Sequence, residues 1–405
     1  MLGRAVFGLA LAASVTPALA EPSGGDDLRG FIDIRAGAAD GEVSFLDEGF
    51  GKSRFGGDNG DWDADALLHG MLSWRHHLTW NLDSVVTVQG DSQLDSVGVV
   101  EAYLSYRGAP SDGWRFSGRA GLFYPPISLE HDGLGWTPTE TITPSAINTW
   151  IGEEVKVAGI EASARHAFGD QEVAITAALF GHNDTAGTLL AFRGWGLDDI
   201  TPSITDELSL PERSFPYQES TRATEELDNR IGYYAQARYR PIGNLNLDVT
   251  YYDNRGDRLS DAHGQTDWAT HFTNVGARWA INEETRLLAQ AMTGRTVWGR
   301  LTPFGYWVDV EFNSAYVLLA RDLGDNLLSG RVDYFAIGDN NRSGPFSWEE
   351  EGWAATAAYQ IRLSPEMRLA FEGMHISSDR PNRADQGLAA DQEQNQLQTS
   401  LKVSF

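Results

Sequence analysis

The sequence predicts an all-β protein, a sixteen-stranded antiparallel transmembrane β-barrel with short periplasmic turns and long outer loops. Three observations predict this fold. The chain ends in a strictly alternating segment, residues 395–405, that stops on Phe405. It begins with an apolar segment typical of export, and templates of about ten alternating residues recur between these ends. A period of two is what a strand shows when lipid lies on one side and water on the other.

The last predicted strand divides its residues cleanly between two faces. Leu397, Leu401 and Phe405 share the apolar face, and Gln398 and Lys402 lie on the opposite face. A terminal strand that ends in Phe resembles the assembly signal of bacterial outer-membrane barrels. This resemblance implies that Phe405 is read by the barrel assembly machinery. Soluble sheets also end in alternating strands, so the membrane interpretation also depends on the N-terminal segment of the chain.

Residues 1–20 form a predicted secretory signal peptide. Arg4 precedes an apolar run over residues 5–15, and Ala18 and Ala20 fit the small-residue rule for cleavage. The alternative, a transmembrane anchor, is disfavoured because the apolar run is too short to span a bilayer. We therefore expect export, a mature chain of residues 21–405 that forms one barrel domain, and a location in the bacterial outer membrane.

Composition excludes several classes of function. The chain has no Cys, which excludes thiol chemistry and thiolate metal sites. Its net charge of −26 argues against nucleic acid as a partner, because phosphates demand a basic face. A polar chain can still be integral to a membrane as a barrel, since only alternate residues need be apolar.

The alternating templates number sixteen, an even number as bacterial single-chain barrels require. The predicted strands cover residues 28–36, 66–78, 82–91, 98–107, 114–123, 154–167, 171–182, 230–240, 244–254, 269–281, 284–295, 308–321, 325–337, 351–363, 366–377 and 395–405. Short connections rich in Gly, Pro, Asn and Asp read as turns. The longer connections cover residues 37–65, 124–153, 183–229, 296–307, 338–350 and 378–394. A soluble β-sandwich is disfavoured because it has no reason to alternate short and long connections so regularly.

The same alternation predicts a charged lumen. The inward positions carry many arginines: Arg75, Arg107, Arg115, Arg119, Arg165, Arg238, Arg240, Arg278, Arg286, Arg321, Arg331, Arg362 and Arg368. They also carry Glu101, Glu161, Asp248, Asp309, Glu311, Asp333 and Glu372. Unpaired buried charges are costly, so either water fills the interior or ion pairs cross it. Sixteen strands make a barrel wide enough for an aqueous channel.

One sector of this lumen is a candidate constriction. Four arginines lie on neighbouring predicted strands, namely Arg75, Arg107, Arg115 and Arg119. The connection 124–153 follows them and carries Glu130, Asp132 and Glu140. If this connection folds inward, its carboxylates face the arginines and create a transverse field, which is how clusters of charge select ions. An ordinary surface loop is the alternative.

The start of that connection resembles the phosphate-selective porin O and P family, and sixteen-stranded trimeric porins more broadly. The residues that carry the resemblance are Gly121-Leu122-Phe123-Tyr124-Pro125-Pro126-Ile127-Ser128-Leu129-Glu130, with 145–148 and 157–161 as the exit and the next strand. The resemblance implies an inward-folding third loop and a homotrimer. The chain departs from the family in its few Lys and its acidic loops. A negative vestibule repels phosphate, so phosphate selectivity is not carried over.

No catalytic residue, metal site or cofactor is predicted, and the chain is not expected to be an enzyme. Asp61, Asp63 and Asp65 could bind calcium but lack the rest of an EF-hand loop, so a solvated acidic loop is favoured. His76 and His77 fall on opposite faces of one strand, and the nucleophile motif Gly-x-Ser-x-Gly does not occur.

The predicted function is an outer-membrane porin, a water-filled channel for passive diffusion of small hydrophilic or charged solutes. Its expected partners are those solutes, the outer-membrane lipids, the assembly machinery and two further copies of itself. The alternative is a non-conducting barrel that serves as an adhesion or structural surface protein. Arginines on the wall and acids in the loops leave the choice between cations and anions open.

Overall fold

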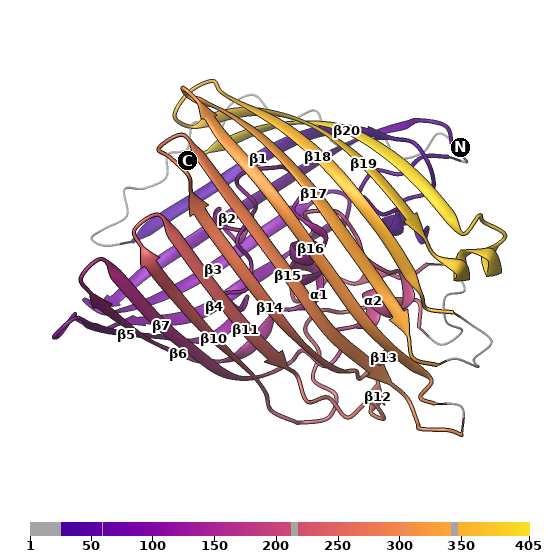
Figure 1. Ribbon diagram of the computed structural model, residues 1–405, viewed down its shortest axis with the longest axis horizontal. Helices are drawn as coiled ribbons and strands as arrows, with labels where there is room; N and C mark the ends of the chain where they lie inside the picture. Colours follow the sequence, from indigo (N-terminus) through magenta and orange to yellow (C-terminus); the bar gives the residue numbers. More distant parts are fainter. Residues whose placement is uncertain (1–25, 59, 212–217, 304, 342–346) are drawn as a thin grey trace.

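A computed structural model of the chain describes residues 26–58, 60–211, 218–303, 305–341 and 347–405. Sixteen antiparallel strands form one closed barrel, in which each strand pairs with its neighbour in the chain (Figure 1). The predicted fold class is therefore confirmed. The predicted signal peptide, residues 1–20, lies outside the described residues. None of the helices in the described ranges is long and apolar enough to cross a membrane.

The barrel strands agree closely with the predicted segments. They are β1 Asp27–Ala39, β2 Asp63–Thr79, β3 Leu82–Asp91, β4 Ser96–Arg107, β5 Trp114–Phe123, β6 Val157–Phe168, β7 Gln171–Gly181, β10 Gly232–Ile242, β11 Leu245–Asp253, β14 Ala269–Ala280, β15 Thr285–Trp298, β16 Val308–Leu323, β17 Asn326–Asp339, β18 Glu350–Arg362, β19 Met367–Asp379 and β20 Asp391–Ser404. Two small sheets, β8 Leu208–Ser209 with β9 Ser220–Thr221 and β12 Asp261–Ala262 with β13 Gln265–Thr266, lie in the long connections.

Two helices also lie in these connections, α1 over Ala146–Glu154 and α2 over Thr188–Phe192, with short 3₁₀ turns at Phe45–Asp47 and Pro381–Gln386. The predicted strand 154–167 begins later, at Val157, because α1 occupies the residues before it. Ser145 starts this helix, since its side chain accepts a hydrogen bond from the Asn148 N–H.

The first and last strands close the barrel. The Gly30 N–H donates to the Phe405 carbonyl at 2.9 Å, and the Phe405 N–H donates back to Gly30 at the same distance. Leu397 and Phe405 are exposed on the outer face, whereas Gln398 is buried on the inner face. The faces predicted for the last strand are therefore confirmed.

An apolar belt covers the outside of the barrel. Large exposed apolar side chains come from strands all round it, among them Ile34, Leu68, Val97, Ile160, Leu179, Val317, Val332, Phe371 and Leu397. Aromatic residues are exposed near the end with the short turns, namely Tyr106, Trp114, Tyr239 and Trp279. A lipid-facing band with an aromatic girdle is the architecture of an outer-membrane barrel.

Strand β16 corrects one set of predicted faces. Arg321, Asp309 and Glu311 were expected inside, but they share the outward face with the exposed Val317. The inward positions hold apolar residues instead, including Val310, which is fully buried. The prediction was wrong because it assumed a polar lumen throughout, whereas this part of the wall supports an apolar core.

That core lies within the barrel. Residues 124–156, 182–211 and 218–231 turn inward, and α1 contacts β15, β16 and β17 while α2 contacts β16 (Figure 1). Trp150 of α1 is fully buried, with its ring 5.3 Å from the Phe272 ring and 5.1 Å from the Phe312 ring, both on the wall. Edge-to-face aromatic contacts of this kind add to the burial of apolar area. The outer half of the lumen is therefore a packed interior.

Replacing Trp150 by Ala tests how much this core contributes to the stability of the barrel. We expect Trp150→Ala to lower the free energy of unfolding by about 3–5 kcal/mol, because a large buried ring leaves a cavity. Trp80→Ala is the matched control; Trp80 is 81% exposed in a turn, and its loss should cost less than about 0.5 kcal/mol. Urea unfolding of the refolded protein measures both. Equal losses in the two variants would contradict a packed lumen.

Candidate functional site: the lumen

The inward segment 124–156 is fastened to the wall by a buried charge cluster. The Arg331 guanidinium on β17 lies 3.2 Å from Glu130 and 2.7 Å from Asp333, and all three side chains are buried. Glu130 also accepts a hydrogen bond from the Ser145 N–H at 3.0 Å. Two carboxylates and one guanidinium satisfy one another here, so the segment is held at a fixed depth in the lumen.

The other two acids predicted for the constriction also pair with nearby wall arginines. Asp132 lies 2.6 Å from Arg278 on β14, and Glu140 lies 3.2 Å from Arg286 on β15. Glu372 of β19 supports the same segment by accepting the Ile142 N–H at 2.7 Å. The acids of the segment are therefore largely neutralised by the wall behind them.

The predicted arginine cluster has different partners. Arg75 and Arg107 both pair with Asp83, at 3.0 and 2.7 Å, near the short turn between β2 and β3. Arg119 pairs with Glu161 at 2.9 Å. None of these contacts joins the cluster to Glu130, Asp132 or Glu140. The structure thus does not bring the two predicted halves of the constriction into contact.

Arg115, the fourth predicted arginine, lies directly opposite Arg165 in the pairing of β5 with β6. Like charges in register repel one another, and water between them lowers that cost. The role of the four predicted arginines in ion selection stays a prediction.

The second inward segment, described over residues 182–211 and 218–231, is held by another buried charge network. Arg35 of β1 binds Asp199 with two hydrogen bonds, at 2.9 and 2.8 Å, and lies 2.8 Å from Asp33. Arg54 lies 3.1 Å from Asp199 and 2.7 Å from Asp91 of β3. Burial alone would raise the pKa of Asp199, but the two guanidiniums hold it far below its usual range. The segment is thus tied to the wall by permanently charged groups.

The periplasmic half of the lumen has a different character. Inward positions near the short turns carry cations on most strands: Arg75, Arg107, Arg115, Arg165, Arg238, Arg240, Arg278, Arg286, Arg362, Arg368 and Lys402. Arg107 and Arg165 keep 62% and 48% of their side-chain surface exposed although they face into the barrel. Exposed charge inside a closed barrel means that water reaches this half.

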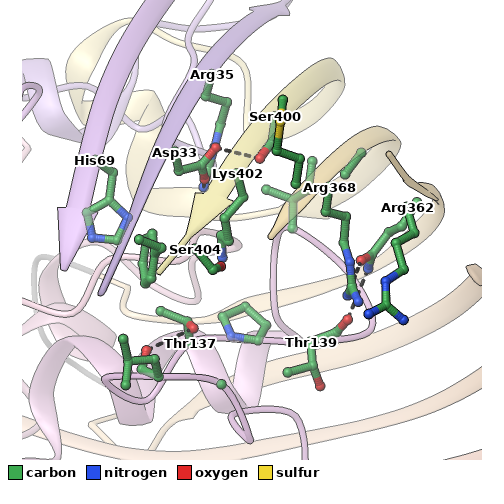
Figure 2. Close-up of a pocket in the computed structure, with 18 of the residues that line it drawn as sticks. Asp33, Arg35, His69, Thr137, Thr139, Arg362, Arg368, Ser400, Lys402 and Ser404 are labelled. Carbon is green, nitrogen blue, oxygen red and sulfur yellow. Dashed lines mark hydrogen bonds and ion pairs between the residues drawn. The ribbon is translucent and has the colours of Figure 1, made fainter. Parts of the chain in front are cut away.

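A cavity of about 330 Å³ opens in this half between residues 133–142 and the wall formed by β18, β19, β20 and β1 (Figure 2). Arg362 on β18 lies opposite Arg368 on β19, and Arg368 lies opposite Lys402 on β20. The three cations therefore form one row across three neighbouring strands. Within the described ranges, no carboxylate forms an ion pair with Arg362 or Arg368; Arg368 donates only to Gln360, at 3.0 Å. We name these three residues the basic row.

One group of side chains in the described residues could hold a metal ion. Ligand atoms of Asp184, Asp228 and Asp267 all lie within 4.8 Å of one another. They come from the connections at the outer end of the barrel. Sequence reasoning missed this group because its members are far apart in the chain and share no spacing that marks a metal site.

Comparison with known protein families and with curated proteins gives no match to this sequence. Solved structures do match. The outer-membrane channel DcaP of Acinetobacter baumannii aligns over 95% of this chain and 98% of its own, with TM-score 0.51 and 13% identity. The chain has the fold of outer-membrane porins. An anion-selective porin from Comamonas acidovorans aligns over 94% and 99% of the two chains, with TM-score 0.51 and 13% identity.

OprB of Pseudomonas putida is a third similar structure, covering 94% of both chains with TM-score 0.52 and 11% identity. At these identities the likeness shows the fold alone. The resemblance to the phosphate-selective O and P family therefore stays a prediction. Both the architecture and these neighbours are those of outer-membrane proteins.

Removing Arg331 tests the cluster that fastens the first inward segment. Arg331→Met leaves Glu130 and Asp333 buried without a cation, and we expect it to lower the free energy of unfolding by about 3–5 kcal/mol. Arg321→Met is the control, because Arg321 is exposed on the outer face and pairs with Glu284 there; its loss should cost at most about 1 kcal/mol. Urea unfolding checks both variants. A stability of Arg331→Met equal to wild type would rule out a fastening role for this cluster.

Proposed function

We propose that this protein is a channel for passive diffusion of small hydrophilic solutes across the bacterial outer membrane. The observation that carries the proposal is the hydrated, charged periplasmic half of the lumen inside a closed barrel. A purely structural barrel has no need to keep many cations facing an internal water-filled space, because each costs solvation unless water or a counter-charge reaches it. The inward segments narrow the path through the barrel, and no covalent step is required.

Anionic solutes are the favoured class. The acids of the segment 124–156 pair with Arg331, Arg278 and Arg286, which removes much of their field from the path. The basic row lines the cavity together with Asp33, Asp199 and Glu366. Asp33 and Asp199 are paired with Arg35, whereas Arg362 and Arg368 form no ion pair within the described ranges. A cluster of one sign in a narrow, low-dielectric space concentrates counter-ions there. The acidic outer loops act at the mouth, where bulk water and salt screen them more strongly.

The second candidate function is a non-conducting barrel with a role in adhesion or surface structure. The observation that favours it is the apolar core around Trp150, which together with the ion-pair networks occupies the outer half of the lumen. In this case the outer loops form the working surface and the inward segments act as a plug. Conductance separates the two candidates.

We further propose a homotrimer embedded in outer-membrane lipid, as the resemblance to trimeric porins implies. Phe405 is the proposed recognition residue for the assembly machinery, and its exposed ring at the end of β20 is accessible for that contact. Chemical cross-linking of the protein in detergent tests the oligomer: a ladder that ends at the trimer supports it, and monomer alone excludes it.

Single-channel recording tests the channel and its charge preference together. We expect steady conductance from refolded protein in a planar bilayer, with a reversal potential under a KCl gradient that shows preference for chloride. The double variant Arg362→Gln/Arg368→Gln should lower the chloride-to-potassium permeability ratio severalfold, because two cations leave the cavity wall.

Arg321→Gln serves as the control, since it removes one cation from the outer face and should leave the ratio unchanged. An unchanged ratio in the double variant would exclude the basic row from selection. An absence of conductance from demonstrably folded protein would exclude the channel and favour the non-conducting barrel.

A further inference from the structure

Three buried carboxylates gather at the outer end of the barrel. Asp184 follows β7, Asp228 precedes β10, and Asp267 lies between β13 and β14. Their ligand oxygens lie within 4.8 Å of one another. Clustered acids by themselves say little, because acidic loops are common on secreted proteins. The hydrogen bonding of the individual carboxylate oxygens says more about this cluster.

Two of those oxygens are buried without a hydrogen bond. Asp267 is fully buried, and its Oδ1 has no hydrogen-bond partner. Asp228 Oδ2 also lacks a hydrogen bond, and that side chain is 1% exposed. A buried carboxylate oxygen with no donor is costly and uncommon in folded proteins. Either a proton shared between Asp228 and Asp267 or a bound cation satisfies such a pair of oxygens.

The other oxygens of the cluster do have donors. Asp184 Oδ2 accepts the Leu227 N–H at 2.5 Å, Asp228 Oδ1 accepts the Arg230 N–H at 2.7 Å, and Asp267 Oδ2 accepts the Asp257 N–H at 3.0 Å. These contacts fix the orientation of the three carboxylates. Asp228 Oδ2 and Asp267 Oδ1 are left without a hydrogen bond.

Two other buried acids of this chain are neutralised at close range. Asp199 is bound by two arginines, and Glu153 is bound by Arg193 through two hydrogen bonds, at 2.5 and 2.6 Å. Within the described residues, the three-carboxylate cluster forms an ion pair with Arg230 alone. The Arg230 Nε lies 3.5 Å from Asp228 Oδ2, and its Nη2 lies 3.1 Å from Asp257. One shared guanidinium leaves the cluster with excess negative charge.

The raised pKa values of two of these acids agree with an excess of negative charge in the cluster. Burial, followed by repulsion from Asp184 and Asp228, raises the pKa of Asp267 to about 9. Burial also raises the pKa of Asp184 to about 7, with Glu226 and Asp228 adding to the effect. Such crowding is what a bound cation relieves.

We propose that Asp184, Asp228 and Asp267 form a binding site for a divalent cation, calcium. All the ligands are oxygens, which suit a hard cation, and a separation of up to 4.8 Å is about twice a calcium–oxygen distance of ~2.4 Å. Gly256 borders the site: a Cβ there would lie 2.3 Å from Asp267 Oδ1, so the absence of a side chain leaves room beside that oxygen.

The site would join segments that are distant in the chain. Asp184 and Asp228 lie near the two ends of the inward segment 182–231, and Asp267 belongs to the connection between β11 and β14. A cation held by all three fixes the base of the segment that carries α2 and Asp199. Calcium would therefore stabilise the lumenal interior from the outside of the cell, whether or not the barrel conducts.

Calcium binding to the refolded full-length protein in detergent tests the site. After removal of divalent ions with a chelator, titration calorimetry and thermal unfolding are recorded with calcium chloride up to about 1 mM, the weak end of extracellular calcium sites. We expect wild type to bind calcium and to unfold at a higher temperature when it does, because a ligand that binds only the folded state stabilises it. Asp267→Asn should lose both the binding and the shift.

The control variant is Asp63→Asn in the exposed acidic run near residues 61–65, which should behave like wild type. Without calcium at neutral pH, Asp267→Asn should be about as stable as wild type, because a pKa raised to about 9 already leaves the Asp267 carboxyl protonated there. If Asp267→Asn does not fold, Asp184→Asn carries the same test. Equal calcium binding by wild type and both cluster variants would overturn the proposal, as would tighter binding of magnesium chloride or no calcium binding at all.

Discussion

Closure of the sheet between β1 and β20 is the constraint on which the rest of the structure depends. In lipid, every backbone N–H and C=O must find a partner within the protein, and only a sheet without edges achieves this with strands. Paired hydrogen bonds between Gly30 and Phe405 complete the ring. Once the ring is closed, each inward side chain must be solvated, paired or packed, and the lumen solves this problem differently at its two ends.

Inward side chains at the outer end of the lumen are packed against the inserted segments, and those at the periplasmic end are solvated by water. Apolar inward residues such as Phe312 meet Trp150 and α2, so the inserted segments behave as the core of a globular protein. Towards the short turns, cations such as Arg107 face open space. The charges therefore vary along the barrel axis, with cations at the periplasmic half of the lumen and acids in the outer loops. The acids expected to take part in a transverse field, Glu130, Asp132 and Glu140, form local ion pairs with Arg331, Arg278 and Arg286, and their part in ion selection stays a prediction.

The strands were predictable from the sequence because a period of two is a local property of about ten residues. Their pairing followed from the order of short and long connections. The ion-pair partners of the lumenal charges were not predictable from the sequence. Glu130 and Arg331, for example, are distant in the chain, and only the folded segment brings them together. One local clue existed for the internal core: residues 317–320 of β16 are apolar on both faces, as in strands buried on both sides. The carboxylate cluster offered no local clue.

The seam between β1 and β20 also determines when the barrel can form. Gly30 lies beneath the ring of Phe405, where a Cβ would come within 2.5 Å of the ring, so the first strand is shaped to receive the last residue of the chain. This contact joins the two most distant parts of the folded sequence. Non-local contacts are slow to form, and this one forms only when β1 and β20 are brought together. Until then both strands have open edges that can pair with other chains. Slow closure of this seam would therefore leave the barrel open to aggregation.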